Sequence, residues 1–423
     1  MDSIDKTYAP VEYMPLEDIE RPERYRPGGY HPIAIGDRLS DRYDVVHKLG
    51  FGTYSTTWLA RDSNTKKYVA IKIAIAEANI LESKILNSLA LSEPSDEGYP
   101  GKALIPRVLD IFSLDGPNGR HTCLVTEPGM MALAEARDAS YTRLFKLPVA
   151  KAIAAQVIQA VAFLHHRGVV HADLHSGNLM LRLPNSIDEL FPGELYEKYG
   201  QPNVEQFVRL YGKPLSGGVP THGVVPISLG KESELVPLSE AKIFVTDFGE
   251  SFLPSITQRH HSNTPGILAP PETYFMPHEP LSFPSDIWTL ACTLWEIIGQ
   301  RPLFEGFNPS SDWMIKEHVD ALGKLPCDWW QKWDARQRWF TEEAKRTYEG
   351  AGRQLANRFV DSIQEPRRES TMEDIGEAEK SALLAMLRGM LAFKPNERLP
   401  VTEIIESQWM LRWALPVLEK VAA

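Results

Sequence analysis

Short stretches in which apolar residues alternate with polar ones, or form brief runs, fill the first third of the chain. The stretches are residues 43–49, 55–60, 68–73, 108–114 and 121–126, and turn residues separate them. A period of two over so few residues is typical of β-strands. A helical pattern near residues 77–90 comes between the third and fourth stretches. The pattern therefore predicts a small antiparallel sheet with one helix.

The pattern becomes mainly helical after Pro148. Apolar residues recur three and four positions apart through Ala150, Ile153, Val157, Val161 and Leu164, and a proline suits the first turn of a helix. A polar stretch rich in proline and glycine, about 184–240, is expected to be a functional or disordered insertion. Residues 1–42 are expected to form an extended arm.

The expected fold class is therefore α+β, with two lobes. Residues 43–130 would form the small sheet lobe and a linker. Residues 131–423 would form a large, mainly helical lobe that carries the insertion at about 184–240.

Composition and charge narrow the choice of partners. The chain has 423 residues, 43% of them hydrophobic, and a formal net charge of −11. This charge argues against nucleic-acid or anionic-membrane binding and suits a cationic partner, although acidic residues also serve solubility alone. Three scattered cysteines fit reducing, intracellular conditions. No signal peptide is expected, and polar residues interrupt the apolar run at 149–164, so no membrane span is expected.

Two features of the predicted small lobe suit phosphate binding. The sequence Leu49-Gly50-Phe51-Gly52 lies between two predicted strands, where glycines let backbone N–H groups approach a phosphate, although a plain hairpin turn would have the same pattern. Lys72 is the single charge in an apolar strand, and a buried lysine requires an anionic partner. Glu82 shares a helix face with the apolar residues at 85, 86 and 89, so we predict a Lys72–Glu82 ion pair.

The strongest chemical signal comes from two polar motifs in the predicted large lobe. Asp173 and Asn178 lie five residues apart in one loop, and Asp247 follows a short apolar strand at 243–245. Magnesium prefers hard oxygen ligands and usually takes only one or two from a protein. The motifs therefore predict that Asp173 accepts the proton of a substrate hydroxyl. Asn178 and Asp247 are predicted to hold magnesium against the phosphates of ATP.

In this order and spacing the motifs resemble those of eukaryotic protein kinases, and the resemblance covers nearly the whole chain. It implies the bilobal kinase fold and transfer of phosphate from Mg-ATP to serine or threonine. The catalytic residues that it implies are Asp173, Lys72, Glu82 and His175. It also implies a structural ion pair between Glu272, at the end of the activation segment, and Arg398.

The same resemblance implies where the nucleotide binds. The implied nucleotide-binding residues are Leu49, Gly50, Phe51, Gly52, Thr57, Ala70, Lys72, Thr126, Glu127, Met130, Asn178 and Asp247. Adenine is expected between the lobes, near Ala70 and the linker that starts at Thr126. Pro128 has no backbone N–H, so Met130 is expected to supply the donor.

Within the kinases, the sequence Tyr-Arg-Pro-Gly-Gly-Tyr-His-Pro at 25–32 is similar to that of the SR-protein kinases, with divergent fungal members the best fit. This similarity implies phosphorylation of serines in Arg-Ser-rich segments of splicing factors, a monomer, and residence in cytoplasm and nucleus. The family docks basic substrates in an acidic groove, near the positions of Asp312, Glu317 and Asp320. A solvated helix face is the favoured interpretation of these three residues.

Three positions depart from the kinase pattern. His175 replaces a lysine that contacts the γ-phosphate, which implies lower or more pH-dependent activity. Thr57 replaces a valine over the adenine, which implies modestly weaker nucleotide binding. Ala172 replaces an arginine that reads a phosphorylated activation loop, which implies activity without loop phosphorylation.

Two alternatives remain open. A pseudokinase that binds nucleotide or acts as a scaffold would explain the departures as drift, but the five catalytic and metal-binding positions are intact. A small-molecule kinase of the aminoglycoside-phosphotransferase type would also have an Asp-x-His-x-x-Asn loop. Against it stand the Asp-Phe-Gly motif at 247–249, Glu272 and Arg398.

Overall fold

The computed structural model describes residues 11–78, 81–91, 93–307, 309–347 and 353–422. The chain forms two compact units, each assembled from three segments. Unit 1 consists of Met1–Lys84, Arg107–Met130 and Leu183–Leu229. Unit 2 consists of Ile85–Pro106, Met131–Arg182 and Gly230–Ala423.

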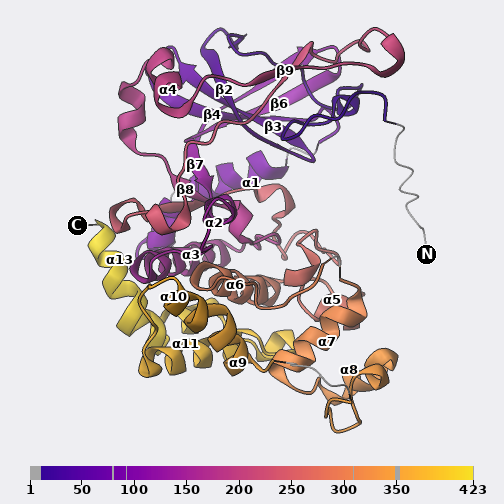
Figure 1. Cartoon of the computed structure of the whole chain (residues 1–423), viewed down its shortest axis with the longest axis vertical. Helices are drawn as coiled ribbons and strands as arrows, with labels where there is room; N and C mark the ends of the chain where they lie inside the picture. The colour runs from indigo at the N-terminus through magenta and orange to yellow at the C-terminus, as the bar shows by residue number, and fades with distance from the viewer. Residues whose placement is uncertain (1–10, 79–80, 92, 308, 348–352, 423) are drawn as a thin grey trace. The chain divides into compact units, whose positions relative to one another are not determined.

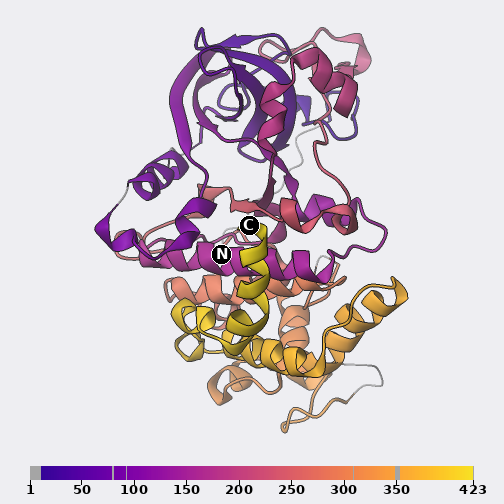
Figure 2. The same ribbon diagram turned by 90° about the vertical axis from the view of Figure 1, so that its left-hand side faces the viewer.

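Unit 1 is built on an antiparallel sheet of six strands in the order β1-β2-β3-β4-β6-β5 (Figure 1). The strands are β1 (Arg38–Leu39), β2 (Tyr43–Gly52), β3 (Ser55–Asp62), β4 (Tyr68–Ala74), β5 (Val108–Gly116) and β6 (Gly119–Thr126). The five predicted strands are confirmed, and β1 is an addition from the N-terminal segment. Figure 2 shows that the strands of this sheet curl strongly, as expected for a twisted antiparallel sheet.

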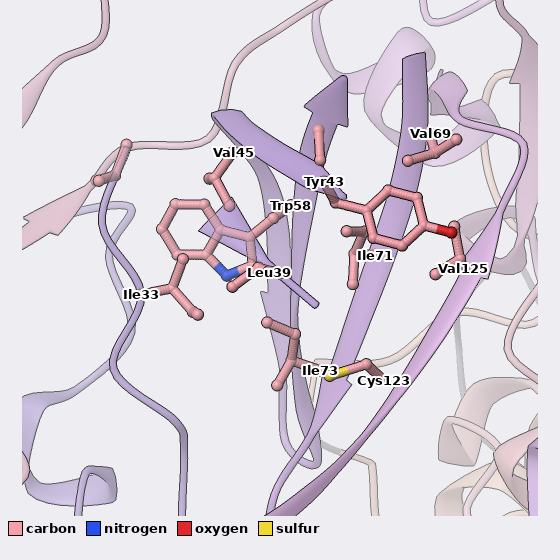
Figure 3. Packing of buried hydrophobic residues seen from close by; sticks show 12 residues of the cluster. Ile33, Leu39, Tyr43, Val45, Trp58, Val69, Ile71, Ile73, Cys123 and Val125 are labelled. Atoms are coloured by element: carbon pink, nitrogen blue, oxygen red, sulfur yellow. The ribbon is translucent and has the colours of Figure 1, made fainter. Parts of the chain in front are cut away.

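One face of this sheet forms the main apolar core of unit 1. Trp58, Ile71 and Val125 are almost completely buried there, together with Ile33 and Leu39 from the N-terminal segment (Figure 3). The predicted extended arm is therefore wrong for residues 11–42. Ile33 and Leu39 belong to the sheet's core, because the open face of a curled sheet has to be covered, and Ile19, Tyr25 and Tyr30 are buried in a second apolar cluster.

Most of the insertion belongs to unit 1, which contains Leu183–Leu229, whereas the sequence placed all of it in the helical lobe; its last residues, from Gly230 on, do belong to unit 2. The insertion contains α4 (Pro192–Tyr199) and the paired strands β9 (Val204–Gln206) and β10 (His222–Val224). Phe207 packs with Ile19, Tyr25 and Tyr30 in a second apolar cluster. The backbone N–H of Ile227 also bonds to the Lys48 carbonyl at 2.8 Å.

The helix predicted at 77–90 starts later than expected, because α1 runs over Leu81–Ala90. The backbone N–H groups of Ala76 and Glu77 donate to the carbonyls of Gly29 and Gly28, at 3.1 and 3.0 Å. These long-range bonds hold residues 76–77 in a turn, which local periodicity cannot reveal.

Unit 2 is mainly helical, as predicted (Figure 1). Its helices are α2 (Leu133–Asp138), α3 (Leu147–His166), α5 (Glu272–Phe275), α6 (Phe283–Ile298), α7 (Ser311–Leu322), α8 (Cys327–Lys332), α9 (Leu355–Phe359), α10 (Glu365–Glu369), α11 (Glu377–Met390), α12 (Val401–Ile405) and α13 (Leu415–Ala422). Three short strands, β7 (Gly129–Ala132), β8 (Leu179–Arg182) and β11 (Ile243–Val245), form a sheet in the order β11-β8-β7.

Helix α3 is the core helix of unit 2. Among the described residues it alone has the length and apolar character of a membrane span, but 89% of its apolar window is buried. Lys151 pairs with Glu379 at 2.8 Å inside that core. Gln156 bonds to the backbone of residues 241 and 243, so these two polar residues have partners within the protein.

Candidate active site

The residues predicted to bind the nucleotide on unit 1 share one face of the sheet. In the strand register Gly50 pairs with Thr57, Thr57 with Lys72, and Ala70 with Thr126. Directly paired residues, and residues two apart on one strand, have side chains on the same face. This face is opposite to the one that carries the apolar core in Figure 3. The sheet thus presents the predicted adenine and phosphate contacts as one surface.

The glycine-rich loop is the turn between β2 and β3. A Cβ built on Gly50 or Gly52 would meet no atom within 4 Å, and the Phe51 side chain is 42% exposed. The two glycines therefore leave open space beside the backbone, into which a phosphate can approach. Thr53 and Tyr54 complete the turn before β3 begins.

The predicted ion pair of Lys72 and Glu82 is confirmed. Lys72 Nζ lies 2.8 Å from Glu82 Oε2 and 2.9 Å from Oε1. Glu82 is in the first turn of α1, where Ile85, Leu86 and Leu89 are buried. Both partners are partly exposed, so the lysine is oriented by the carboxylate but still accessible to a ligand.

The predicted linker residues follow β6. Thr126 ends that strand, and Glu127 Oε1 lies 3.2 Å from Arg107 Nε. Met130 is a buried residue of β7. The roles assigned to these residues in adenine binding stay predictions.

On unit 2, the loop at 171–178 orients Asp173 through Asn178. Asn178 Nδ2 donates to the Asp173 carbonyl at 2.8 Å and to Asp173 Oδ2 at 3.3 Å. Asp173 Oδ1 is buried and has no hydrogen-bond partner among the residues that the structure describes. A buried carboxylate oxygen without a donor is costly, and here it is well suited to accept a proton from a bound hydroxyl.

Asp247 is brought to this loop by the pairing of β8 with β11. Leu179 pairs with Val245, and the Thr246 N–H donates to the Asn178 carbonyl at 2.8 Å. Asp247 itself has a left-handed backbone, with φ of +60°. Such a conformation is uncommon for a non-glycine residue and is concentrated at functional sites.

His175 has a defined orientation beside Asp173. The Gly177 N–H donates to His175 Nδ1 at 3.1 Å, and His175 Nε2 lies 3.7 Å from Asp173 Oδ2. Because Nδ1 accepts a hydrogen bond, the ring proton is assigned to Nε2. The ring can therefore act as a neutral N–H donor next to the carboxylate.

The backbone before Asp173 is fixed from two sides. Ala172 has a φ of +64°, and its N–H donates to Asp286 Oδ1 at 2.9 Å. The hydroxyls of Thr264 and Ser262 lie 2.9 and 3.0 Å from its carbonyl. Burial alone would raise the pKa of Asp286, but the His165 ring and the Ala172 N–H outweigh it and hold the pKa below its usual value.

The sequence analysis missed this support from Ser262 and Thr264. Both precede the segment that ends at Glu272, and hydroxyl residues in a loop have no periodic signal. The two residues lie about ninety positions from Ala172 in the sequence, so only the folded chain brings them into contact with it. The contact joins the loop that carries Asp173 to the segment before Glu272 through the backbone of Ala172.

The side chains of Asn178 and Asp247 suit a magnesium ion. With its amide nitrogen bonded to Asp173, Asn178 presents its amide oxygen, and Asp247 contributes a carboxylate. Within the described part of the chain, no group of three or more His, Cys, Asp or Glu residues could hold a metal. Mg²⁺ takes few protein ligands and completes its shell with water and substrate phosphates, so two oxygen donors are sufficient.

The predicted structural pair is also confirmed. Arg398 Nη1 and Nη2 lie 2.8 and 2.5 Å from the two Glu272 oxygens, and both residues are buried. The guanidinium also lies 5.1 Å from the ring centroid of Trp288. This bidentate pair ties the end of the activation segment to α6.

The interpretation of α7 as a solvated acidic face is wrong for two of its three residues. Glu317 is buried against Arg358 at 2.8 Å, and Asp320 is buried between Lys316 at 2.8 Å and Arg346 at 2.7 Å. Their charges are neutralised inside unit 2. They are therefore not available to a docking substrate.

Asp312, the third residue, lies at a pocket of about 690 Å³ in unit 2. Residues of α5, α7 and the segment 332–338 line it. Asp312 accepts a hydrogen bond from Trp333 Nε1 at 3.0 Å. The other charged residues of the pocket are Asp334, Lys332 and Arg338, so its charge is mixed.

Comparisons with known proteins agree with this geometry. Residues 43–187 match the family described as "Protein kinase domain". A serine/threonine protein kinase of Aspergillus fumigatus is 25% identical over 401 residues, which cover 93% of this chain and 90% of that protein. A crystal structure of a kinase domain shares the fold, with a TM-score of 0.60 and 16% identity over 90% of this chain and 98% of that one.

Animal relatives match over a shorter region. Human SRSF protein kinase 3 is 37% identical over 172 residues, 39% of this chain and 30% of that protein. Spk-1, a serine/threonine-protein kinase of Caenorhabditis elegans, is 34% identical over 190 residues, 43% of this chain and 19% of that protein. The chain thus spans less than a third of the length of these two animal relatives.

The fold and the shared sequence define the chain as a protein serine/threonine kinase with the bilobal kinase fold. Within that class, its matches to SRSF protein kinase 3, spk-1 and the fungal kinase support membership of the SR-protein kinase family.

Proposed function

We propose that this kinase transfers the γ-phosphate of Mg-ATP to serine hydroxyls in Arg-Ser-rich or otherwise basic protein segments. The observation that supports it best is the geometry of Asp173. One carboxylate oxygen is held by Asn178, while the buried Oδ1 has no partner within the described residues. An oriented carboxylate with a free acceptor suits the removal of a proton from a substrate hydroxyl.

The residues of unit 1 bind and orient the nucleotide in this proposal. Lys72, held by Glu82, binds phosphate oxygens. The open backbone at Gly50 and Gly52 donates N–H groups to the phosphates. Thr57, Ala70 and the linker residues Thr126, Glu127 and Met130 contact the adenine.

On unit 2, Asn178 and Asp247 would hold magnesium, which neutralises charge on the phosphates when it is bound. His175 donates its Nε2 proton to a phosphate oxygen beside Asp173. This is a neutral contact where the resemblance implies a charged lysine, so a lower rate is expected than in kinases that have the lysine.

The choice of a basic substrate rests on the family relationship and on the net charge of −11. An acidic protein attracts basic segments and repels nucleic acid at long range. The pocket beside α7 has two acidic and two basic residues, so it does not by itself select a basic peptide. The proposal treats the chain as a monomer that acts on proteins.

The test is phosphate transfer from Mg-ATP to an Arg-Ser repeat peptide, with an acidic peptide as the substrate control. Asp173→Ala should lower kcat by about 10²–10⁴-fold, the usual contribution of a positioned acid or base. Asp361→Ala is a suitable control variant, because Asp361 is a partly exposed carboxylate paired with Arg353 in another part of unit 2.

Transfer to the Arg-Ser peptide alone, lost in Asp173→Ala and retained in Asp361→Ala, would support the proposal. Equal transfer to the acidic peptide would contradict the substrate assignment. Binding of Mg-ATP without transfer to either peptide would favour a pseudokinase instead.

A further inference from the structure

Residues 24–30, Arg-Tyr-Arg-Pro-Gly-Gly-Tyr, lie before the matched kinase region yet contact the glycine-rich loop directly. We refer to them as the clamp segment. The Tyr30 hydroxyl donates to the Gly52 carbonyl at 2.5 Å. The Arg24 guanidinium donates to the Thr53 carbonyl and lies over the Tyr30 ring, 5.2 Å from its centroid. Two side chains of the segment thus hold two successive carbonyls of the loop.

The clamp segment also holds the chain that leads into α1. The carbonyls of Gly28 and Gly29 accept the N–H groups of Glu77 and Ala76, at 3.0 and 3.1 Å. Gly28 has a φ of +83°, and a Cβ there would lie 2.0 Å from Glu77 Oε1. These positions require glycine. The requirement explains the Gly-Gly pair at 28–29, which has no part in the catalytic site itself.

The clamp segment is itself rigidly supported within unit 1. Asn118 accepts from the Gly28 N–H at 2.7 Å, and its Nδ2 donates to the Tyr30 carbonyl at 2.7 Å. The same Nδ2 donates to the Gly218 carbonyl of the insertion at 3.0 Å. The ring of Tyr25 lies 5.5 Å from the ring of Tyr30 and 6.4 Å from that of Phe207, also in the insertion.

Apart from the pairing of β2 with β3, the loop has little other support at its tip. Gly50 and Gly52 have open space around them, and the side chains of Phe51 and Tyr54 are exposed. The Tyr54 carbonyl accepts the Ile75 N–H at 2.9 Å, a contact one residue after the two carbonyls that the clamp segment holds. A flexible loop loses conformational entropy when it closes on a ligand, and contacts that order it beforehand reduce that loss.

We propose that the clamp segment positions the glycine-rich loop and the chain entering α1 together, and so sets the affinity of this kinase for Mg-ATP. Tyr30 and Arg24 are positioning residues, and they act through the loop backbone. The effect on affinity rests on the proposed function, whereas the ordering of the loop is independent of it.

The test compares Tyr30→Phe with Tyr68→Phe in the full chain. Each substitution removes one hydroxyl that donates to a carbonyl in unit 1, Gly52 for Tyr30 at 2.5 Å and Leu190 for Tyr68 at 3.1 Å. The two tyrosines are 2% and 3% exposed, so the variants are matched in burial. Loss of one hydrogen bond should raise KM for Mg-ATP about 3- to 10-fold in Tyr30→Phe. The value of kcat should change less than about twofold in both variants, and KM should stay unchanged in Tyr68→Phe.

Hydrogen exchange of the amides at 50–55 in the nucleotide-free protein provides the second measurement. It should accelerate by about 3- to 10-fold in Tyr30→Phe and remain at the wild-type rate in Tyr68→Phe. Arg24→Met, which keeps an unbranched apolar stem but removes the guanidinium donor, should act in the same direction as Tyr30→Phe.

Unchanged exchange at 50–55 in both Tyr30→Phe and Arg24→Met would overturn the clamp. An equal rise of KM in Tyr30→Phe and Tyr68→Phe would show a general loss of stability and would also overturn it. If the wild-type chain transfers no phosphate, the proposed function fails, while the exchange measurement still decides whether the clamp orders the loop.

Discussion

A single hydrogen bond determines what His175 can contribute to phosphate transfer. The Gly177 N–H occupies Nδ1, which leaves Nε2 as the donor, 3.7 Å from Asp173 Oδ2. A neutral imidazole N–H can stabilise a phosphate oxygen, but it has no full positive charge in this geometry. A lysine ammonium at the same position would add that charge where negative charge develops.

We therefore expect a graded series of variants at His175. His175→Lys should raise kcat about 3- to 10-fold, because it adds a full charge next to the phosphate. His175→Gln, which keeps a neutral N–H donor, should remain within about threefold of the wild type. His175→Ala, which removes the donor, should lose about 10- to 100-fold. Single-turnover rates with saturating Mg-ATP and the Arg-Ser peptide measure the series.

His261→Ala serves as the control, since His261 is an exposed histidine of the activation segment. Equal rates for wild type, Gln and Ala variants at position 175 would show that His175 makes no contribution to transfer.

The charged residues of the candidate site could be singled out from the sequence because each one is unusual where it stands. A lysine in an apolar strand and an Asp-x₄-Asn spacing have few structural explanations. Ser262 and Thr264 were missed because serine and threonine are common in loops. Only the folded chain brings their hydroxyls to the Ala172 carbonyl, at 3.0 and 2.9 Å.

Among the elements, the positions of the strands in unit 1 were predicted better than the burial of the charged residues in α7. The strands of unit 1 are short stretches rich in apolar and β-branched residues and bounded by turn residues, a local signal that is visible in the sequence. In α7, the acidic residues resemble a solvated face because their partners are distant in the sequence. Arg358 pairs with Glu317 and Arg346 pairs with Asp320, and neither arginine belongs to the helix.

Helix α7 also contains a buried histidine that makes the element sensitive to acid. His318 is packed against Trp288, Phe304 and Tyr274, with ring centroids 4.9, 4.5 and 6.5 Å away. Burial, together with the positive charges of Arg358 and Arg398, lowers the pKa of His318 to about 3. The folded state therefore keeps this ring neutral under conditions in which an exposed histidine is charged.

We expect His318→Leu to reduce the acid sensitivity of the fold. In the unfolded chain a histidine binds a proton below a pKa of about 6.5, so stability is lost as the pH falls from there towards 3. At pH 5.5 this one group should cost about 1.4 kcal/mol relative to pH 7.5. The thermal midpoint should therefore fall less between these pH values in His318→Leu than in the wild type.

Burial also lowers the pKa values of His31, His47 and His121. Both the wild type and His318→Leu contain these three residues, so the difference between the two proteins reports on His318 alone. His278 is exposed, so the control variant His278→Gln should show the same pH dependence of the thermal midpoint as the wild type. The same loss of thermal midpoint in His318→Leu and in the wild type would rule out this role for His318.

At the scale of the whole chain, unit 1 extends beyond the residues that match the kinase family as a domain. The match to the kinase family begins at residue 43 and ends at residue 187, whereas unit 1 also contains earlier residues and the segment Leu183–Leu229. Sequence analysis located the lobes through motifs and periodicity. It could not show that the N-terminal segment and the insertion cover the sheet, because those contacts join residues far apart in the sequence.

We therefore expect a chain of residues 43–423 not to fold, whereas residues 11–423 should keep all the described contacts. The shorter chain lacks Ile33 and Leu39, which are buried with Val45 and Trp58 in the core of unit 1 (Figure 3). Removing two such side chains costs about 4–10 kcal/mol, comparable with the about 5–15 kcal/mol that stabilises a typical domain. Circular dichroism and thermal unfolding of the two purified chains provide the measurement. A cooperative transition of 43–423 within a few degrees of that of 11–423 would show that the sheet does not depend on the N-terminal segment.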